Sequence, residues 1–255
     1  MNIPIKIYPA KPAKVYLYVT CLVNHFSPTT GMDAINLLER EGIEVEVITE
    51  QTCCGQPAYN SGYVEQSKQV ALSQLELFSL PIPIVILSGS CGGMMRKHYP
   101  DLLADHPKVH EFSQRVYELS EFLLHVCQIK LQDNGTATTV TLHTSCSGRR
   151  EMGIHTTGLK LLSQLNQVTV VEHEYSHECC GFGGTFSVKQ ADISASMVED
   201  KSKYLSQSNC DSFVSTDWGC MLNINGALQY QSSPLRGEHL ATFLNRRLKK
   251  AEEVL

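Results

Sequence analysis

Two patterns of hydrophobic and polar residues follow each other in a fixed order along the chain. Short runs rich in β-branched and aliphatic residues are typical of buried strands, and apolar residues at helical spacing are typical of amphipathic helices. The expected strands are residues 14–20, 43–49, 83–89, 138–144, 168–173 and 211–216, and the expected helices are residues 33–42, 63–78, 149–165 and 188–205.

The order of these elements occurs twice, and the polar segment QDNGTAT at residues 132–138 separates the two copies. Strands that alternate with helices of this length indicate βαβ units and parallel sheets. We therefore predict an α/β fold of two tandem Rossmann-like parallel-sheet halves. An internal duplication relates them by pseudo-twofold symmetry, with the first half at residues 1–132 and the second at residues 133–255.

The cysteines repeat this division. In each half a first cysteine is followed, after 31 or 32 residues, by the tripeptide Cys-Cys-Gly, and 36 or 39 further residues separate that pair from a last cysteine. The first thiol set is Cys21, Cys53, Cys54 and Cys91, and the second is Cys146, Cys179, Cys180 and Cys220. Cys127 and Cys210 have no counterpart, and we expect both to be structural.

Every cysteine of the two thiol sets follows the end of an expected strand. Open α/β sheets bind their ligands at the carboxyl ends of the strands, so three loops of each half are expected to converge on one site. Thiolates that arrive from several loops suit a soft metal centre. Adjacent thiolates can bind different irons, and Gly55 and Gly181 let the backbone approach a cluster closely. The residues therefore favour one or two iron–sulfur clusters.

Two alternatives to a cluster stay open. Four thiolates per half are also the donor set of a Cys₄ zinc site, although the chain lacks the usual C-x₂-C spacing. The other alternative is thiol redox chemistry at the Cys-Cys pairs. Neighbouring Cα atoms lie about 3.8 Å apart, whereas disulfides usually span about 4.4–6.8 Å, so such a bridge needs a distorted peptide.

Several basic residues lie near the cysteines in the sequence. His25, His143 and His177 are candidate nitrogen ligands, although ten histidines make some proximity to cysteine expected. Arg149 and Arg150 follow Cys146 at the start of an expected helix. They are candidates for binding a substrate carboxylate or an acidic group of a partner, and a solvated helix start is the equal alternative.

The composition narrows the class of protein. The chain has 255 residues, with 42% hydrophobic and 18% charged residues and a net charge of −5, which is typical of a globular protein and gives no footprint for nucleic acid. The N-terminus has no apolar signal region, and the apolar run at 79–89 is too short for a transmembrane segment. We expect a cytoplasmic protein, where free thiols bind metals more often than they pair.

Six stretches of the chain carry a resemblance to a known family. They are QTCCGQPAYNSG, LSGSCGGMMRKHYPDL, RVYELSEFL, HTSC, CCGFGGTFSVK and STDWGCMLNINGAL. The chain resembles the CCG, or cysteine-rich, domain of the B subunit of heterodisulfide reductases and of the iron–sulfur subunits of glycolate oxidases. Within that family it is most similar to stand-alone lactate-utilisation members.

The chain departs from the family pattern at the end of each repeat. The family pattern ends in C-x-x-C, whereas Ser88 and Asp217 stand where the first of those two cysteines is expected. The resemblance thus implies four thiolates per half, which suffices for a [4Fe–4S] or [2Fe–2S] cluster and disfavours the five-cysteine, non-cubane type. Asp217 is a minority candidate for an additional oxygen ligand.

The resemblance also implies a function. It implies an iron–sulfur electron-transfer subunit of an oxidoreductase system that oxidises L-lactate, a small 2-hydroxy acid, to pyruvate. Such a subunit works only in a complex with other iron–sulfur subunits, because the family's stand-alone members lack a flavin domain of their own. No catalytic residue is assigned.

Overall fold

The first half of the chain forms a four-stranded parallel sheet. The computed structural model describes residues 7–249. The strand order is β2-β1-β3-β4, so β1 pairs with β2 on one side and with β3 on the other. The strands are β1 (Lys14–Tyr18), β2 (Glu44–Glu46), β3 (Ile84–Ile86) and β4 (Val116–Glu118).

The second half repeats this sheet with the same order, β6-β5-β7-β8, and again all pairs are parallel. The six strands expected from the sequence are present, while β4 and β8 were not expected. The duplicated α/β fold is therefore confirmed, with one additional strand in each half. The strands are β5 (Thr138–His143), β6 (Val168–Val170), β7 (Ser212–Ser215) and β8 (Gly237–His239).

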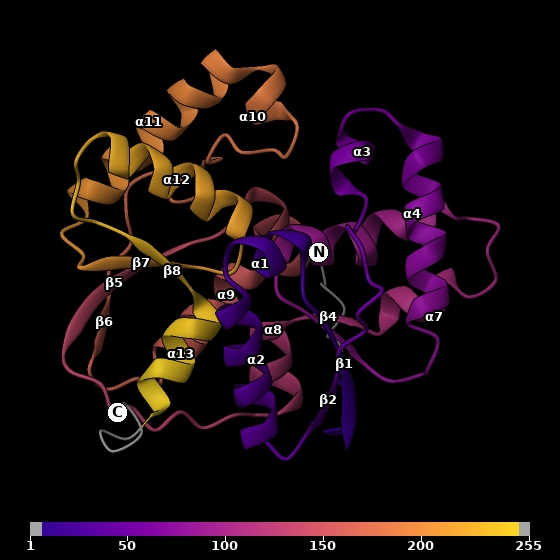
Figure 1. Ribbon diagram of the computed structural model, residues 1–255. Helices are drawn as coiled ribbons and strands as arrows, with labels where there is room; N and C mark the ends of the chain where they lie inside the picture. Colours follow the sequence, from indigo (N-terminus) through magenta and orange to yellow (C-terminus); the bar gives the residue numbers. More distant parts are fainter. Residues whose placement is uncertain (1–6, 250–255) are drawn as a thin grey trace, which may run out of the picture.

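Helices connect the strands of each half (Figure 1). In the first half they are α1 (Cys21–Phe26), α2 (Pro28–Arg40), α3 (Gln56–Asn60), α4 (Val64–Leu77), α5 (Gly89–Gly93), the π-helix η1 (Met94–His98), α6 (Tyr99–Leu102), α7 (Val109–Gln114), α8 (Leu119–Glu121) and the π-helix η2 (Phe122–Val126). In the second half they are the π-helix η3 (Gly148–Met152), α9 (Ile154–Leu162), α10 (Phe186–Lys189), α11 (Ala191–Gln207), α12 (Trp218–Tyr230) and α13 (Leu240–Leu248).

Three helices differ from the expected bounds for local reasons. The first begins at Pro28 rather than at residue 33, because proline is favoured in the first turn of a helix. The stretch 149–165 is divided at Gly153, whose φ of +68° is left-handed and ends a helix. The stretch 188–205 is divided at Gln190 into α10 and α11.

Alternate residues of the central strands face two different cores. Val15 and Leu17 belong to a core shared by the two halves, whereas Tyr16 and Tyr18 belong to an outer core of the first half alone. In the shared core α2 packs against α13, and α8 packs against α9 (Figure 1). These two helix pairs are equivalent under exchange of the halves, as a pseudo-twofold axis requires.

The expected linker is held firmly to the second half. Asp133 forms a buried ion pair with Arg247 of α13, with 2.6 Å between Oδ1 and the guanidinium nitrogen, and the Asn134 amide donates to the Arg247 carbonyl. The division at residues 132 and 133 stays a prediction. Over residues 7–249, no helix is both long enough and apolar enough to cross a membrane.

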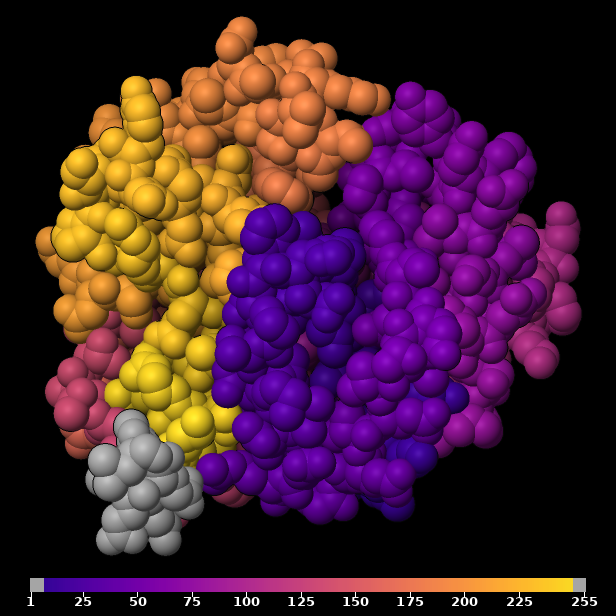
Figure 2. Space-filling model, in the orientation of Figure 1, coloured from indigo at the N-terminus to yellow at the C-terminus, as the bar shows by residue number. Residues whose placement is uncertain are grey.

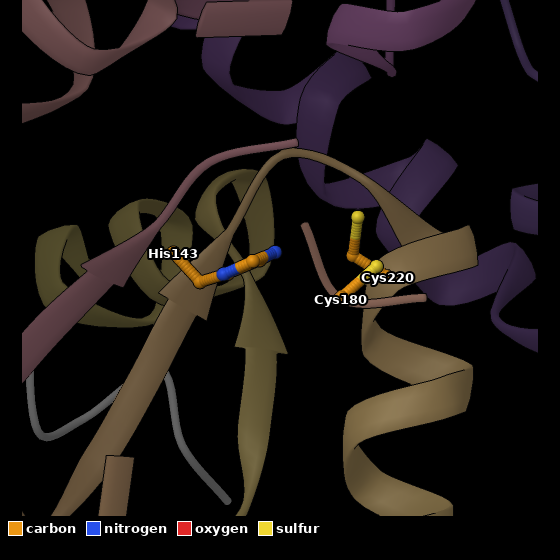
Figure 3. A group of neighbouring side chains, drawn as sticks. All are labelled: His143, Cys180 and Cys220. Carbon is orange, nitrogen blue, oxygen red and sulfur yellow. The ribbon is translucent and has the colours of Figure 1, made fainter. Parts of the chain in front are cut away.

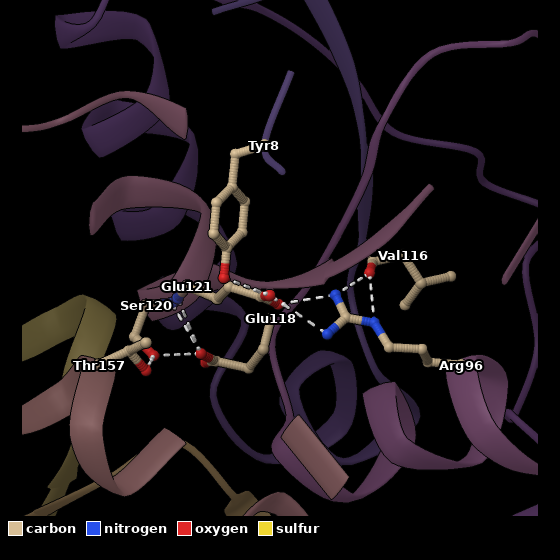
Figure 4. Close-up of polar contacts among 7 residues, drawn as sticks. All are labelled: Tyr8, Arg96, Val116, Glu118, Ser120, Glu121 and Thr157. Atoms are coloured by element: carbon tan, nitrogen blue, oxygen red, sulfur yellow. Dashed lines mark hydrogen bonds and ion pairs between the residues drawn. The ribbon is translucent and has the colours of Figure 1, made fainter. Parts of the chain in front are cut away.

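A polar network closes the end of β4, where the two halves meet (Figure 4). The Glu118 carboxylate accepts from the Ser120 amide and hydroxyl and so caps α8, while Ser120 contacts Thr157 of α9. Beside it, Arg96 forms a 2.6 Å ion pair with Glu121. The residue equivalent to Glu118 in the second half is His239, which caps α13 through the Ala241 amide.

Candidate metal centre

Both thiol sets line one cavity between the two halves. The cavity has a volume of about 570 Å³, and the eight cysteines expected to act as ligands all contribute to its wall. In Figure 2 the orange surface of the second half and the purple surface of the first half border a recess where they meet. The sequence predicted convergence within each half, and the structure adds that the two convergence points open into a common space.

The first thiol set forms a chain of contacts along the carboxyl edge of the first sheet. Cys21 begins α1, and Cys91 lies in α5. Hydrogen bonds from Cys21 and Cys54 lower the pKa of Cys53 to about 3, while the same contacts and burial raise the pKa of Cys21 and of Cys54. Among Cys21, Cys53 and Cys54, the Cys53 thiol is therefore the one that ionises most readily.

The second thiol set repeats this arrangement. Hydrogen bonds from Cys146 and Cys180 lower the pKa of Cys179 to about 2. The hydrogen bond between Cys180 and Cys220 lowers the pKa of Cys220, but burial together with the charges of Asp217 and Cys179 outweighs it, and the net shift is upward. All ten cysteines of the chain are free thiols. The thiols contact one another in the same sequence in both halves, and in each half the first cysteine of the Cys-Cys pair has the lowered pKa.

The glycine of each Cys-Cys-Gly motif turns the backbone back onto the thiolate. Gly55 and Gly181 have φ values of +83° and +80°, a region that favours glycine. Each glycine amide donates to the sulfur two residues before it, with an N···S distance of 3.4 Å at both Cys53 and Cys179. These glycines therefore supply a hydrogen-bond donor to the site as well as room for the backbone.

The second cysteine of each pair is fixed through its carbonyl group. The Tyr99 hydroxyl donates to the Cys54 carbonyl at 2.9 Å, and the Asn223 amide donates to the Cys180 carbonyl at 2.8 Å. Tyr99 lies in α6, eight residues after Cys91, and Asn223 lies in α12, three residues after Cys220. Different side chains thus perform the same positioning role in the two halves.

Ser88 and Asp217, which replace the missing cysteines, meet each other across the two halves. The Ser88 hydroxyl donates to Asp217 Oδ2 at 3.1 Å, and the Ser90 amide donates to the same oxygen at 3.0 Å. Both Ser88 and Asp217 are buried. This oxygen of Asp217 therefore has two partners within the protein, and its role as a metal ligand stays a prediction.

The three histidines named from the sequence lie in different environments. His143 is buried at the end of β5, and its ring points toward Cys180 and Cys220 (Figure 3). Burial lowers the pKa of His143 well below its ordinary value, so its imidazole is neutral at pH 7. His25 lines a different cavity, of about 750 Å³, together with Cys21 and Cys53, and His177 is exposed.

Arg149 and Arg150, which are adjacent in the sequence, lie in different environments. Arg149 points into a polar cluster, where it donates to Thr144, Ser176 and His155 at 3.0–3.3 Å. Arg150 lines the cavity that holds the thiol sets.

The two cysteines without a counterpart stand apart from the thiol sets. Cys127 packs in the shared core, and Cys210 accepts a hydrogen bond from Ser208. Neither one lines the thiol cavity.

Sequence reasoning missed two residues that distinguish the two sites from each other. Lys201 is buried in α11, where its ammonium group donates to the Tyr175 carbonyl at 2.9 Å. Burial lowers the pKa of Lys201, against electrostatic attraction by groups that include Cys180 and Cys220. The equivalent residue of the first half is Gln74. In each half, the backbone atom nearest to a Cβ placed on the CCG glycine is a serine carbonyl oxygen, of Ser67 at Gly55 and of Ser194 at Gly181. Gln74 and Lys201 each lie seven residues after that serine.

Tyr18 is the other missed residue. It precedes Cys21 by three residues, as His143 precedes Cys146, and the two therefore occupy the same position in their halves. This correspondence is visible in the sequence as YVTC against HTSC.

Fold and site together define a protein of two cysteine-rich α/β repeats whose thiol sets share one cavity. The family model of the CCG cysteine-rich domain matches residues 15–96 and 140–225, one match in each half. The chain belongs to this family.

Individual relatives agree with that assignment. The chain is 40% identical over 244 residues to Lactate utilization protein A of Halalkalibacterium halodurans, which covers 94% of this chain and 100% of the relative. It is also 40% identical over 238 residues to Lactate utilization protein A of Bacillus subtilis, with 92% and 100% covered.

A solved structure supports the fold alone. A hypothetical protein from Helicobacter pylori matches with a TM-score of 0.61 at 10% identity. The match covers 95% of this chain and 50% of that protein, so this chain spans half its length.

Proposed function

We propose that the protein is an iron–sulfur electron-transfer subunit of a cytoplasmic system that oxidises L-lactate. The observation that carries this proposal is the pair of equivalent four-thiol sets on one cavity. The relatives named Lactate utilization protein A, at 40% identity over most of the chain, support the role in lactate utilisation.

The donor atoms fit an iron–sulfur cluster. Each set offers four sulfurs from three loops, and in each the pKa of one thiol lies far below neutrality. Thiolates are the usual ligands of such clusters, and backbone N–H···S bonds like those of Gly55 and Gly181 tune them. When bound, such a group accepts and releases single electrons.

The residues of this chain would hold the redox groups, and the partner subunits would complete the reaction. Oxidation of lactate to pyruvate releases two electrons and two protons, so other iron–sulfur subunits are needed as electron donors and acceptors. Arg150 lines the cavity and offers a cation for the carboxylate of a 2-hydroxy acid or of a partner's side chain.

One observation favours a second candidate, a zinc-binding role. The ligand atoms of His143, Cys180 and Cys220 lie within 4.8 Å of one another, and sulfur–nitrogen sets of this kind also bind zinc. Zinc has no redox chemistry, so this candidate excludes electron transfer at the second set.

Anaerobic reconstitution separates the two candidates. We expect iron and acid-labile sulfide in about equal amounts, and a paramagnetic signal after reduction. Stoichiometric zinc without iron, in a colourless protein, would contradict the electron-transfer proposal. In the complex with its partner subunits, Arg150→Gln should retain iron and lose lactate-dependent reduction if the cavity binds the carboxylate.

A further inference from the structure

We propose that His143 supplies a nitrogen ligand to the second thiol set, so that the two halves hold chemically different metal sites. This inference rests on the proposed function, because it requires metal at that set. It concerns a side chain that is not a cysteine and that has no equivalent histidine in the first half.

The first observation is that the His143 imidazole is buried without a partner. The residue is 0% exposed, and neither Nδ1 nor Nε2 has a hydrogen-bond partner among residues 7–249. Burying a polar group without a hydrogen bond costs about 1–3 kcal/mol, and such groups are rare in folded proteins. A ligand at one ring nitrogen removes that cost.

The second observation is the direction of the ring. Figure 3 shows the ring extending from the end of β5 toward the two cysteines, which come from two other segments. A ring nitrogen lies within 4.8 Å of both Sγ atoms. This spacing suits donors to one metal or to neighbouring irons of a cluster. Imidazole accompanies thiolate as a ligand in one known type of iron–sulfur centre.

The first half lacks this donor. Tyr18 stands at the position of His143, and burial, together with the electrostatic influence of Cys54 and Cys91, raises its pKa. Its side chain packs in the same core cluster as Cys54, with Cys53 and Cys91 packed against that cluster. However, the Tyr18 hydroxyl donates to the Thr52 carbonyl, which satisfies it within the protein. The first set is left with sulfur donors.

Asp217 is the other candidate for an additional ligand of the second set. Its Oδ2 already accepts hydrogen bonds from Ser88 and Ser90 of the first half. Within the described part of the chain, the imidazole of His143 has no competing hydrogen-bond partner. The geometry therefore assigns the additional donor to His143 rather than to the carboxylate.

The test is nitrogen hyperfine spectroscopy on the anaerobically reconstituted, reduced full-length chain. We expect a strongly coupled ¹⁴N signal that changes to ¹⁵N when the protein is labelled with ¹⁵N-histidine. This measurement needs no variant and is independent of folding defects. A protein with full iron and sulfide but only weak coupling would overturn the inference and leave the proposed function standing.

Matched variants locate the nitrogen. His143→Gln should abolish the strong coupling and lower the iron content by up to half, whereas Tyr18→Phe, at the equivalent position, should leave the coupling intact. Coupling that persists in His143→Gln would overturn the assignment.

The metal content distinguishes the remaining outcomes. If the chain holds zinc alone, the proposed function fails, and loss of zinc in His143→Gln but not in Tyr18→Phe still supports the ligand. If zinc content is equal in both variants, the ligand assignment fails as well. A chain that binds no metal overturns both.

Discussion

The two halves of the molecule share a backbone and differ in the charge around their thiols. In the first half the buried residues beside the site are neutral, with Tyr18 next to the thiols and Gln74 in the helix behind them. In the second half the same two positions carry His143 and Lys201. A duplicated fold therefore presents the same sulfur ligands in two electrostatic settings, and side chains rather than topology distinguish the sites.

The difference extends to the interface between the halves. Glu118 and His239 occupy equivalent cap positions, and Ser88 and Asp217 occupy equivalent positions at the ends of β3 and β7. In each pair one residue is acidic and the other is not. Two of these residues, Ser88 and Asp217, bind each other. Divergence of the halves has thus produced a complementary contact that two identical halves could not form.

The largest expected effect tests whether the thiol sets bind metal independently. Cys54→Ser and Cys180→Ser each remove one thiol from one set, and we expect each variant to retain about half the iron. The control is Cys210→Ser, because Cys210 does not line the cavity. Iron analysis after anaerobic reconstitution measures the result. Complete loss of iron in either single variant would show that the two sets form one site.

The second effect concerns the two CCG glycines. A Cβ at residue 181 would lie 2.7 Å from the Ser194 carbonyl oxygen, whereas at residue 55 it would meet nothing nearer than 3.4 Å. Positive φ alone costs about 1–2 kcal/mol for a residue with a Cβ. We expect Gly55→Ala to lower the free energy of unfolding by about that amount and Gly181→Ala to lower it by about 3 kcal/mol or more.

Urea unfolding of the reduced chain measures both losses. The control is Gly42→Ala, which has a φ of +75° and open space around the Cβ position. Its loss should match that of Gly55→Ala. Equal losses at residues 55 and 181 would mean that α11 shifts to relieve the contact.

Much of this architecture follows from sequence for a clear reason. Cysteine spacing and strand–helix alternation are local patterns, and parallel strands place their carboxyl ends at one edge. The shared cavity could not be predicted, because it depends on how α2, α9 and α13 pack between the halves. Strands β4 and β8 were missed because no cysteine of the two thiol sets follows them, and β8 contains Gly237 and Glu238.

The residues that distinguish the sites were only partly predictable. His143 was a candidate by its proximity to Cys146, yet its value as a donor depends on burial without a partner, which only the packing shows. Lys201 lies 21 residues beyond Cys180 and carries no local signal. The alignment of YVTC with HTSC was the one sequence signal that compares the two sites directly.

The third effect concerns the free energy of unfolding. Its dependence on pH should have opposite signs at Glu118 and His239, which occupy equivalent helix-cap positions. Burial raises the pKa of Glu118 from 4.5 to about 7, so its contribution to stability is fully present below pH 4.5 and is lost as the pH rises through 7. Burial lowers the pKa of His239 from 6.5 to about 4, so its contribution is present above pH 6.5 and is lost as the pH falls through 4.

Two variants separate these contributions. Glu118→Gln should remove the decline in the free energy of unfolding between pH 4.5 and 7. His239→Gln should remove the rise in the free energy of unfolding between pH 4 and 6.5. Each change is of the order of 3 kcal/mol at most. Free energies of unfolding measured from pH 4 to 8 test this. A shift in the same direction for both variants would contradict the assignment of opposite signs.

The smallest effect is the influence of Lys201 on the reduction potential of the second site. A positive charge favours the reduced state, which carries one more negative charge. A unit charge about 10 Å away, at an effective dielectric constant of about 20, contributes about 1.7 kcal/mol, or roughly 70 mV for one electron. Lys201→Gln copies the residue of the first half and should lower the potential of the second site by tens of millivolts.

A redox titration followed by EPR would resolve this shift, with Lys203→Gln as the matched control. Lys203 lies on the same helix but is exposed, so solvent and salt screen its charge. We expect the control to leave both potentials unchanged and Lys201→Gln to bring the two sites closer together. If Lys201→Gln moved both potentials equally, the charge would act on the cavity as a whole, and Lys201 would not account for an electrostatic difference between the two sites.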